Sequence, residues 1–116
     1  MSDADGRLPA GLEAASIVRR AERAGDFATL LRRGDPDRGS IILVVTSRGR
    51  HVAILERMLS ADGAYRWNRS GPDDSGESGE VAAFLQKRAR FDPDSWEIEL
   101  DIANPERFIA ETTSAG

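Results

Sequence analysis

Residues 40–46 limit the possible folds of this chain more than any other segment. They are apolar on both faces of an extended chain, since Ile41, Leu43 and Val45 alternate with Ile42 and Val44. A strand with two apolar faces is stable only when both are covered, so it belongs in the middle of a sheet with helices above and below. Residues 51–57 show the same pattern, which predicts a second covered strand beside it.

The other periodic segments supply the remaining elements. Apolar residues at helical spacing predict helices over residues 9–24 and 80–89, and further strands are expected over 27–33, 65–69 and 96–103. The order α-β-β-β-β-α-β predicts an α+β fold with a mixed, mostly antiparallel five-stranded sheet. We expect the first four strands to form a meander and the sheet to lie in a three-layer α-β-α sandwich; the alternative is a two-layer sheet with both helices on one face.

The length of 116 residues suits one domain, which we place at residues 8–109. Residues 70–79 contain no large apolar side chain and predict a flexible surface loop. Residues 1–7 and 110–116 are expected to be disordered tails, with Phe108 and Ile109 packing back on the domain.

Composition excludes several classes of protein. The chain has no cysteine, which excludes disulfides, thiol catalysis and thiolate metal sites. Its net charge of −4 argues against a globally basic nucleic-acid binder, and its longest aliphatic run, Ile41 to Val45, is far too short to cross a membrane. With no secretory signal at the N-terminus, we expect a cytoplasmic protein without a membrane partner.

Charge is segregated along the sequence. Residues 19–69 carry eleven arginines against six acidic residues, a net charge of +5, whereas residues 70–116 carry four basic and eleven acidic residues, a net charge of −7. Either the two segments pair inside the fold, or the basic segment offers a surface to an anionic partner.

Asp-Pro-Asp occurs twice, as Asp35-Pro36-Asp37 and as Asp92-Pro93-Asp94. Each copy is typical of a rigid turn, because proline fixes the first corner and the carboxylates accept backbone N–H groups. Were the two loops to meet, these carboxylates with Glu97 could hold Mg²⁺ or Ca²⁺ in a hydrolase or nuclease.

Arginines near strand ends suggest a binding surface around Arg32, Arg33, Arg66 and Arg69. Tyr65 and Trp67 lie among them in the sequence, an arrangement also found in single-stranded nucleic-acid binders, although Trp67 fits a core position. The candidate binding residues are Arg32, Arg33, Asp35, Asp37, Arg66, Arg69, Asp92, Asp94 and Trp96.

Other candidate chemistry is weak. Glu97, Glu99 and Asp101 share one face of the last strand, and we expect this face to be solvated or paired with the arginine-rich segment; a restriction-type nuclease would need a lysine where Glu99 stands. His51 is the only histidine and is expected at a strand end on the surface. No nucleotide-binding signature is present, so no cofactor is predicted.

Several segments together resemble a bacterial family, domain of unknown function 1491. They are Val18–Gly25, Leu31–Gly39, Arg66-Trp67 and Arg90–Glu99, and the resemblance covers about residues 8 to 102. It implies a single-domain protein, and it brings no reaction, ligand or catalytic residue to this chain.

Three functions therefore stay open. The first is a non-enzymatic interaction module that binds a protein or an anionic partner through the arginines. The second is a metal-dependent hydrolase or nuclease built on the Asp-Pro-Asp loops, and the third is a nucleic-acid accessory binder. The sequence does not indicate an oligomeric state.

Overall fold

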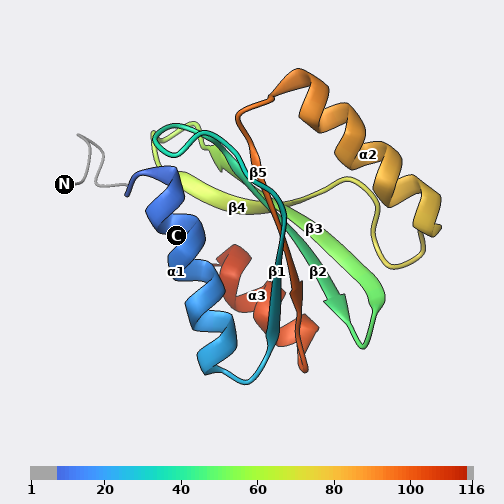
Figure 1. The fold of residues 1–116 in the computed structure, drawn as a ribbon. Helices are drawn as coiled ribbons and strands as arrows, with labels where there is room; N and C mark the ends of the chain where they lie inside the picture. The colour runs from blue at the N-terminus through green and yellow to red at the C-terminus, as the bar shows by residue number, and fades with distance from the viewer. Residues whose placement is uncertain (1–7, 115–116) are drawn as a thin grey trace.

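The structure, a computed structural model, describes residues 8–114 (Figure 1). The predicted α+β fold with a mixed five-stranded sheet is confirmed. In chain order the elements are α1 (Ala10–Arg23), β1 (Phe27–Arg32), β2 (Ile41–Ser47), β3 (Arg50–Leu59), β4 (Tyr65–Ser70), α2 (Ser78–Phe91), β5 (Trp96–Asp101) and α3 (Pro105–Ser114). No helix in this described part is long and apolar enough to span a membrane.

The strands lie in the order β1-β5-β2-β3-β4. β5 is parallel to β2 and antiparallel to β1, so the expected four-stranded meander is wrong for β1 and holds only for β2, β3 and β4. Burial explains the order. Four of the six β5 residues are buried and only Glu99 and Asp101 are half-exposed, whereas β1 is largely exposed and occupies the edge. The long connection between β1 and β2 gives the chain room to skip one strand position.

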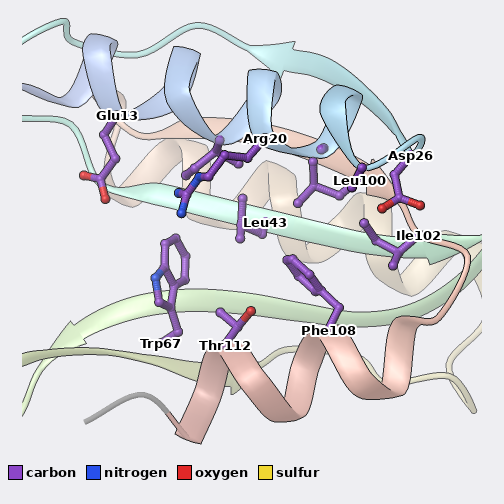
Figure 2. Close-up of a pocket in the computed structure, with 12 residues that line it drawn as sticks. Glu13, Arg20, Asp26, Leu43, Trp67, Leu100, Ile102, Phe108 and Thr112 are labelled. Carbon is purple, nitrogen blue, oxygen red and sulfur yellow. The ribbon is translucent and has the colours of Figure 1, made fainter.

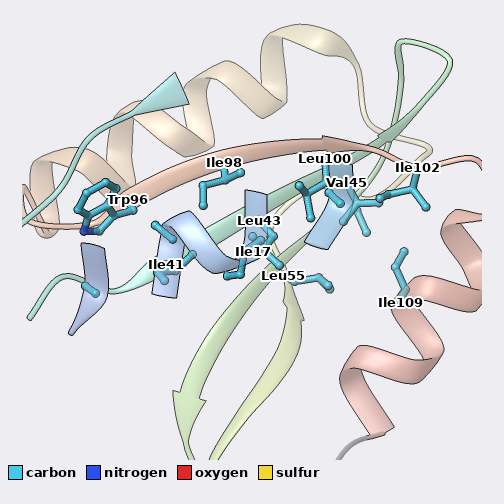
Figure 3. Packing of buried hydrophobic residues seen from close by; sticks show 14 residues of the cluster. Ile17, Ile41, Leu43, Val45, Leu55, Trp96, Ile98, Leu100, Ile102 and Ile109 are labelled. Carbon is cyan, nitrogen blue, oxygen red and sulfur yellow. The ribbon is translucent and has the colours of Figure 1, made fainter. Parts of the chain in front are cut away.

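The main core lies on one face of the sheet, under α1 and α3 (Figures 1 and 3). α1 begins after Pro9 and stops before Gly25, whose φ of +86° favours glycine, close to the predicted bounds. Its buried stripe is rich in alanine, which lets the helix lie close to the strands. The core residues are Ala10, Ala14, Ile17, Ala21, Ile41, Leu43, Val45, Ala53, Leu55, Trp96, Ile98, Leu100, Ile102 and Ile109.

α2 lies on the opposite side of the sheet from α1 (Figure 1), which makes the molecule a three-layer α-β-α sandwich. On this second face Arg88 of α2 pairs with the buried carboxylate of Glu56, which also accepts a hydrogen bond from the Ser70 hydroxyl. A polar anchor thus joins α2 to the sheet above the apolar residues Ile42, Val44 and Ile54.

The chain after β5 differs from expectation, because residues 105–114 form a third helix where a tail was predicted from residue 110. Asn104 accepts the Arg107 N–H through its side chain, and Pro105 occupies the first helical position, where its missing N–H costs nothing. Ile109 is buried against the sheet and holds the helix in place. The rest of the two predicted tails, residues 1–7 and 115–116, lies outside the described residues.

Candidate functional site

The two Asp-Pro-Asp segments meet in the fold. The Asp35 N–H donates to the Asp94 carbonyl at 2.9 Å, and the Trp96 indole Nε1–H donates to the Asp35 carbonyl at 2.8 Å. Arg32 adds a bond from Nη2 to the Pro93 carbonyl at 2.8 Å. Backbone groups, one indole and one guanidinium therefore join the two loops.

The carboxylates of these loops serve their own turns. Asp35 Oδ1 accepts the N–H groups of Asp37 and Arg38, each at 2.9 Å, and Asp92 Oδ1 accepts the Asp94 N–H at 3.2 Å. The bonds from Arg38 and then Asp37 lower the pKa of Asp35. Over residues 8–114, histidine and carboxylate side chains nowhere gather in a group of three or more that could hold a metal ion.

Two glycines make the meeting of the loops possible. A Cβ at Gly34 or Gly39 would overlap the Asp94 carbonyl and the Trp96 indole, well inside van der Waals contact. The spacing of these glycines around Asp35-Pro36-Asp37 is the signal that sequence reasoning missed: both mark a close approach of another backbone, which only the fold identifies.

A groove of about 770 Å³ opens beside these loops, between α1 and β1. Leu12 and Val18 form the α1 wall, Leu30 of β1 forms the other wall, and Trp96 lies at the base. Leu12 and Leu30 are 58% and 47% exposed, so the groove presents apolar surface to solvent.

Basic side chains border the groove. Arg33 places its guanidinium 5.8 Å from the centre of the Trp96 ring, and Arg19 lines the α1 side. Neither forms an ion pair with a described residue, while Asp37 is the one carboxylate among the lining residues. The rim is therefore net positive.

The fold separates the four arginines that the sequence suggested as one surface. Arg32 and Arg33 lie at the β1 edge, whereas Arg66 and Arg69 lie on β4 at the opposite edge of the sheet. Arg66 also pairs with Asp62 of its own hairpin. The residues brought together at the groove and its loops are Arg32, Arg33, Asp35, Asp37, Asp92, Asp94 and Trp96.

The acidic row on β5 was expected to be solvated or paired with the arginine-rich segment, but Glu97 is buried and forms no ion pair within residues 8–114. Glu97 is buried beside Arg32 of β1, and its Oε2 has no hydrogen-bond partner among the described groups. Burial raises the pKa of this carboxyl, and the positive charge of Arg32 offsets part of the effect. Asp101, at the other end of β5, accepts the N–H groups of Arg48 and Gly49 and closes the β2–β3 turn.

His51 lies in β3, half-buried, with Nε2 2.8 Å from the Pro72 carbonyl. That bond ties the loop after β4 to the sheet. The hydrogen bonds of the described serine side chains all go to other groups, so this histidine has no serine partner of the kind a hydrolase uses.

Comparison with known proteins found a matching family and several similar solved structures. The family described as "Protein of unknown function (DUF1491)" matches residues 8–110. A crystal structure of a DUF1491 family protein from Caulobacter crescentus is similar over 84% of this chain and 90% of its own, with 26% identity and a TM-score of 0.75. An NMR structure of a DUF1491 family protein from the same organism has 29% identity and a TM-score of 0.69, covering 81% of this chain and 84% of its own.

A solution structure of a protein from A. tumefaciens is similar at 25% identity and a TM-score of 0.69, over 83% of this chain and 86% of its own. No curated protein matches the chain.

Proposed function

Because this chain belongs to the DUF1491 family, whose description assigns no activity, we propose a function from its geometry: a non-enzymatic interaction module. It binds an extended, acidic and apolar segment of a partner protein along the outer edge of β1 and in the groove beside it.

The single observation that carries this proposal is the open β1 edge next to an apolar groove. β1 is the last strand of the sheet on its side, so its outward N–H and C=O groups have no strand partner among residues 8–114. An extended peptide can add to such an edge as a further strand, with main-chain hydrogen bonds giving affinity and side-chain pockets giving specificity.

Apolar side chains flank this edge on both faces of the sheet. Leu30 faces the groove, while Phe27, whose partner on β5 is Asp101, lies on the other face and is 74% exposed. An added strand with alternating side chains would cover both residues. The partner segment should therefore carry apolar residues.

Charge selects an acidic partner. Arg19 and Arg33 border the groove without carboxylate partners, and arginine pairs well with carboxylates through its planar guanidinium. A second copy of β1 would not satisfy them, since residues 27–32 contain no acidic side chain. A strand rich in glutamate or aspartate would supply carboxylates for both guanidinium groups.

The test uses a labelled peptide of alternating glutamate and valine, and a counterpart with lysine in place of glutamate. We expect only the glutamate peptide to bind in fluorescence anisotropy, and the double variant Arg19→Glu/Arg33→Glu to weaken it by about tenfold, near 1.4 kcal/mol. The variant Arg23→Glu/Arg90→Glu makes the same change in net charge at two exposed arginines outside the groove, and should bind like the wild type.

The proposal of a groove selective for acidic segments would be rejected if the two peptides bound equally well. It would also be rejected if both double variants lost the same amount of affinity for the glutamate peptide. If sedimentation shows a dimer and Leu30→Lys abolishes it, the β1 edge instead binds a second copy of the chain.

A further inference from the structure

A second cavity, of about 360 Å³, lies on the other flank of α1, between α1 and α3 (Figure 2). Its walls are mostly apolar: Leu43, Leu100 and Ile102 come from the sheet and the end of β5, and Phe108 comes from α3. Trp67 of β4 closes one side. The volume is at the lower end of the range of about 300–1,000 Å³ that is usual for small-molecule pockets.

Small side chains keep this cavity open. Where α1 passes over it, the lining residues include Ala21 and Ala24, whose methyl groups do not reach across to α3. The same alanines that let α1 lie close to the strands thus leave space between the two helices.

One unpaired cation faces this cavity. The Arg20 side chain extends from α1 toward Trp67 (Figure 2) and forms no ion pair with any residue the structure describes. Glu13, the α1 carboxylate that also lines the cavity, is held by both terminal nitrogens of Arg57. The Thr112 hydroxyl also lines the cavity and has no hydrogen-bond partner within residues 8–114.

The remaining charged group limits what can bind. Asp26 lies at the end of the cavity near Ile102 (Figure 2), where its Oδ1 accepts the Ala103 N–H at 3.0 Å. Its negative charge disfavours a second anionic group at that end.

We propose that this cavity binds a small monocarboxylate with an apolar body. The carboxylate pairs with the Arg20 guanidinium and accepts the Thr112 hydroxyl, and the apolar part lies against Leu43, Leu100 and Phe108. A charged hydrogen bond in a mostly apolar pocket gives orientation as well as affinity. This site is separate from the β1 groove and does not depend on the function proposed for that groove.

Octanoate is the probe, with octanol, octylamine and the dicarboxylate suberate as comparisons, and binding is measured by calorimetry and by the fluorescence of Trp67 in a Trp96→Phe background. We expect octanoate to bind more tightly than all three comparisons. Arg20→Met keeps the apolar stem, and should weaken octanoate at least about tenfold while leaving octanol unchanged. Arg23→Met, the same change one turn along α1, should have no effect.

A second variant covers the case in which Arg20→Met does not fold. Ala24 is exposed at the cavity wall, so Ala24→Leu should fold and should abolish octanoate binding by filling the space. Octanoate that does not bind the wild type, binds no better than octylamine, or binds Ala24→Leu as well as the wild type would overturn the proposal.

Discussion

Two acidic residues of one strand have pKa values shifted in opposite directions, because their surroundings differ. Glu97 lies buried with one oxygen unpartnered, and its pKa is raised, chiefly by burial. Asp101 accepts backbone N–H groups at a turn, and its pKa is lowered, most of all by the bond from Gly49. Stability should therefore depend on pH through these two residues with opposite signs.

For Glu97 the unfolded chain loses its proton near the ordinary pKa of 4.5, and the folded chain loses it at higher pH. Between those values the folded state holds more protons, so stability falls as pH rises. Urea denaturation of Glu97→Gln should thus show a growing gain over the wild type as pH rises through this window. A constant difference from acid to neutral pH would contradict this.

For Asp101 the unfolded pKa is near 3.8 and the folded pKa is lower, so the unfolded state holds more protons between them. The stability that Asp101 adds is present above the unfolded value and is lost as pH falls through the folded one. Asp101→Asn should lose stability at neutral pH and approach the wild type in acid. A loss that persists unchanged in acid would mean that ionisation of Asp101 is not its source.

Gly39 is buried where the two Asp-Pro-Asp loops touch, and a methyl group there has no space. Gly39→Ala should lower the free energy of unfolding by about 2 kcal/mol or more, as overpacking against backbone does. Gly79→Ala is the control: no atom lies within 4 Å of its Cβ, and alanine in α2 should stabilise by up to about 1 kcal/mol. Similar losses in both variants would disprove a tight contact at Gly39.

At the scale of elements, α2 is held to the sheet by the pair between Arg88 and Glu56. Arg88→Met should cost about 3 kcal/mol, since the buried Glu56 carboxylate would keep only the Ser70 hydroxyl. Hydrogen exchange should then speed up more in α2 than in α1, whereas Arg90→Met on the same helix should leave both unchanged. Uniform acceleration of both helices would show that α2 is not a separately anchored element.

The helices and strands could be predicted from local sequence patterns, but which strands pair with each other could not. The alternation from Trp96 to Ile102 identifies β5, yet its insertion between β1 and β2 depends on contacts more than fifty residues apart in sequence. α3 does have a local signal, Asn104-Pro105 before the apolar pair Phe108 and Ile109, but the expectation of a tail from residue 110 left it unused. The burial of Glu97 could not be predicted from the sequence. Alternation shows which residues share a face of the strand, but it does not show how much of that face other elements cover.

In the whole molecule, the ion pairs show whether the basic and acidic segments of the sequence pair with each other. The four ion pairs formed by described residues join Glu13 to Arg57, Asp62 to Arg66, Glu56 to Arg88 and Glu111 to Arg107. None joins an arginine of residues 19–69 to an acid of residues 70–116. The basic segment is thus left with guanidinium groups at the surface, two of them at the groove between α1 and β1, which supports an anionic partner there.

The most direct test of acidic-peptide binding at the β1 edge is amide chemical-shift mapping of the ¹⁵N-labelled protein with the glutamate–valine peptide. We expect the shifts to concentrate in β1 and along the groove side of α1, and the β1 amides to become protected from exchange as a strand forms on their open edge. Shifts centred on β4 around Arg66 and Arg69, or binding that leaves the β1 amides unprotected, would contradict the account.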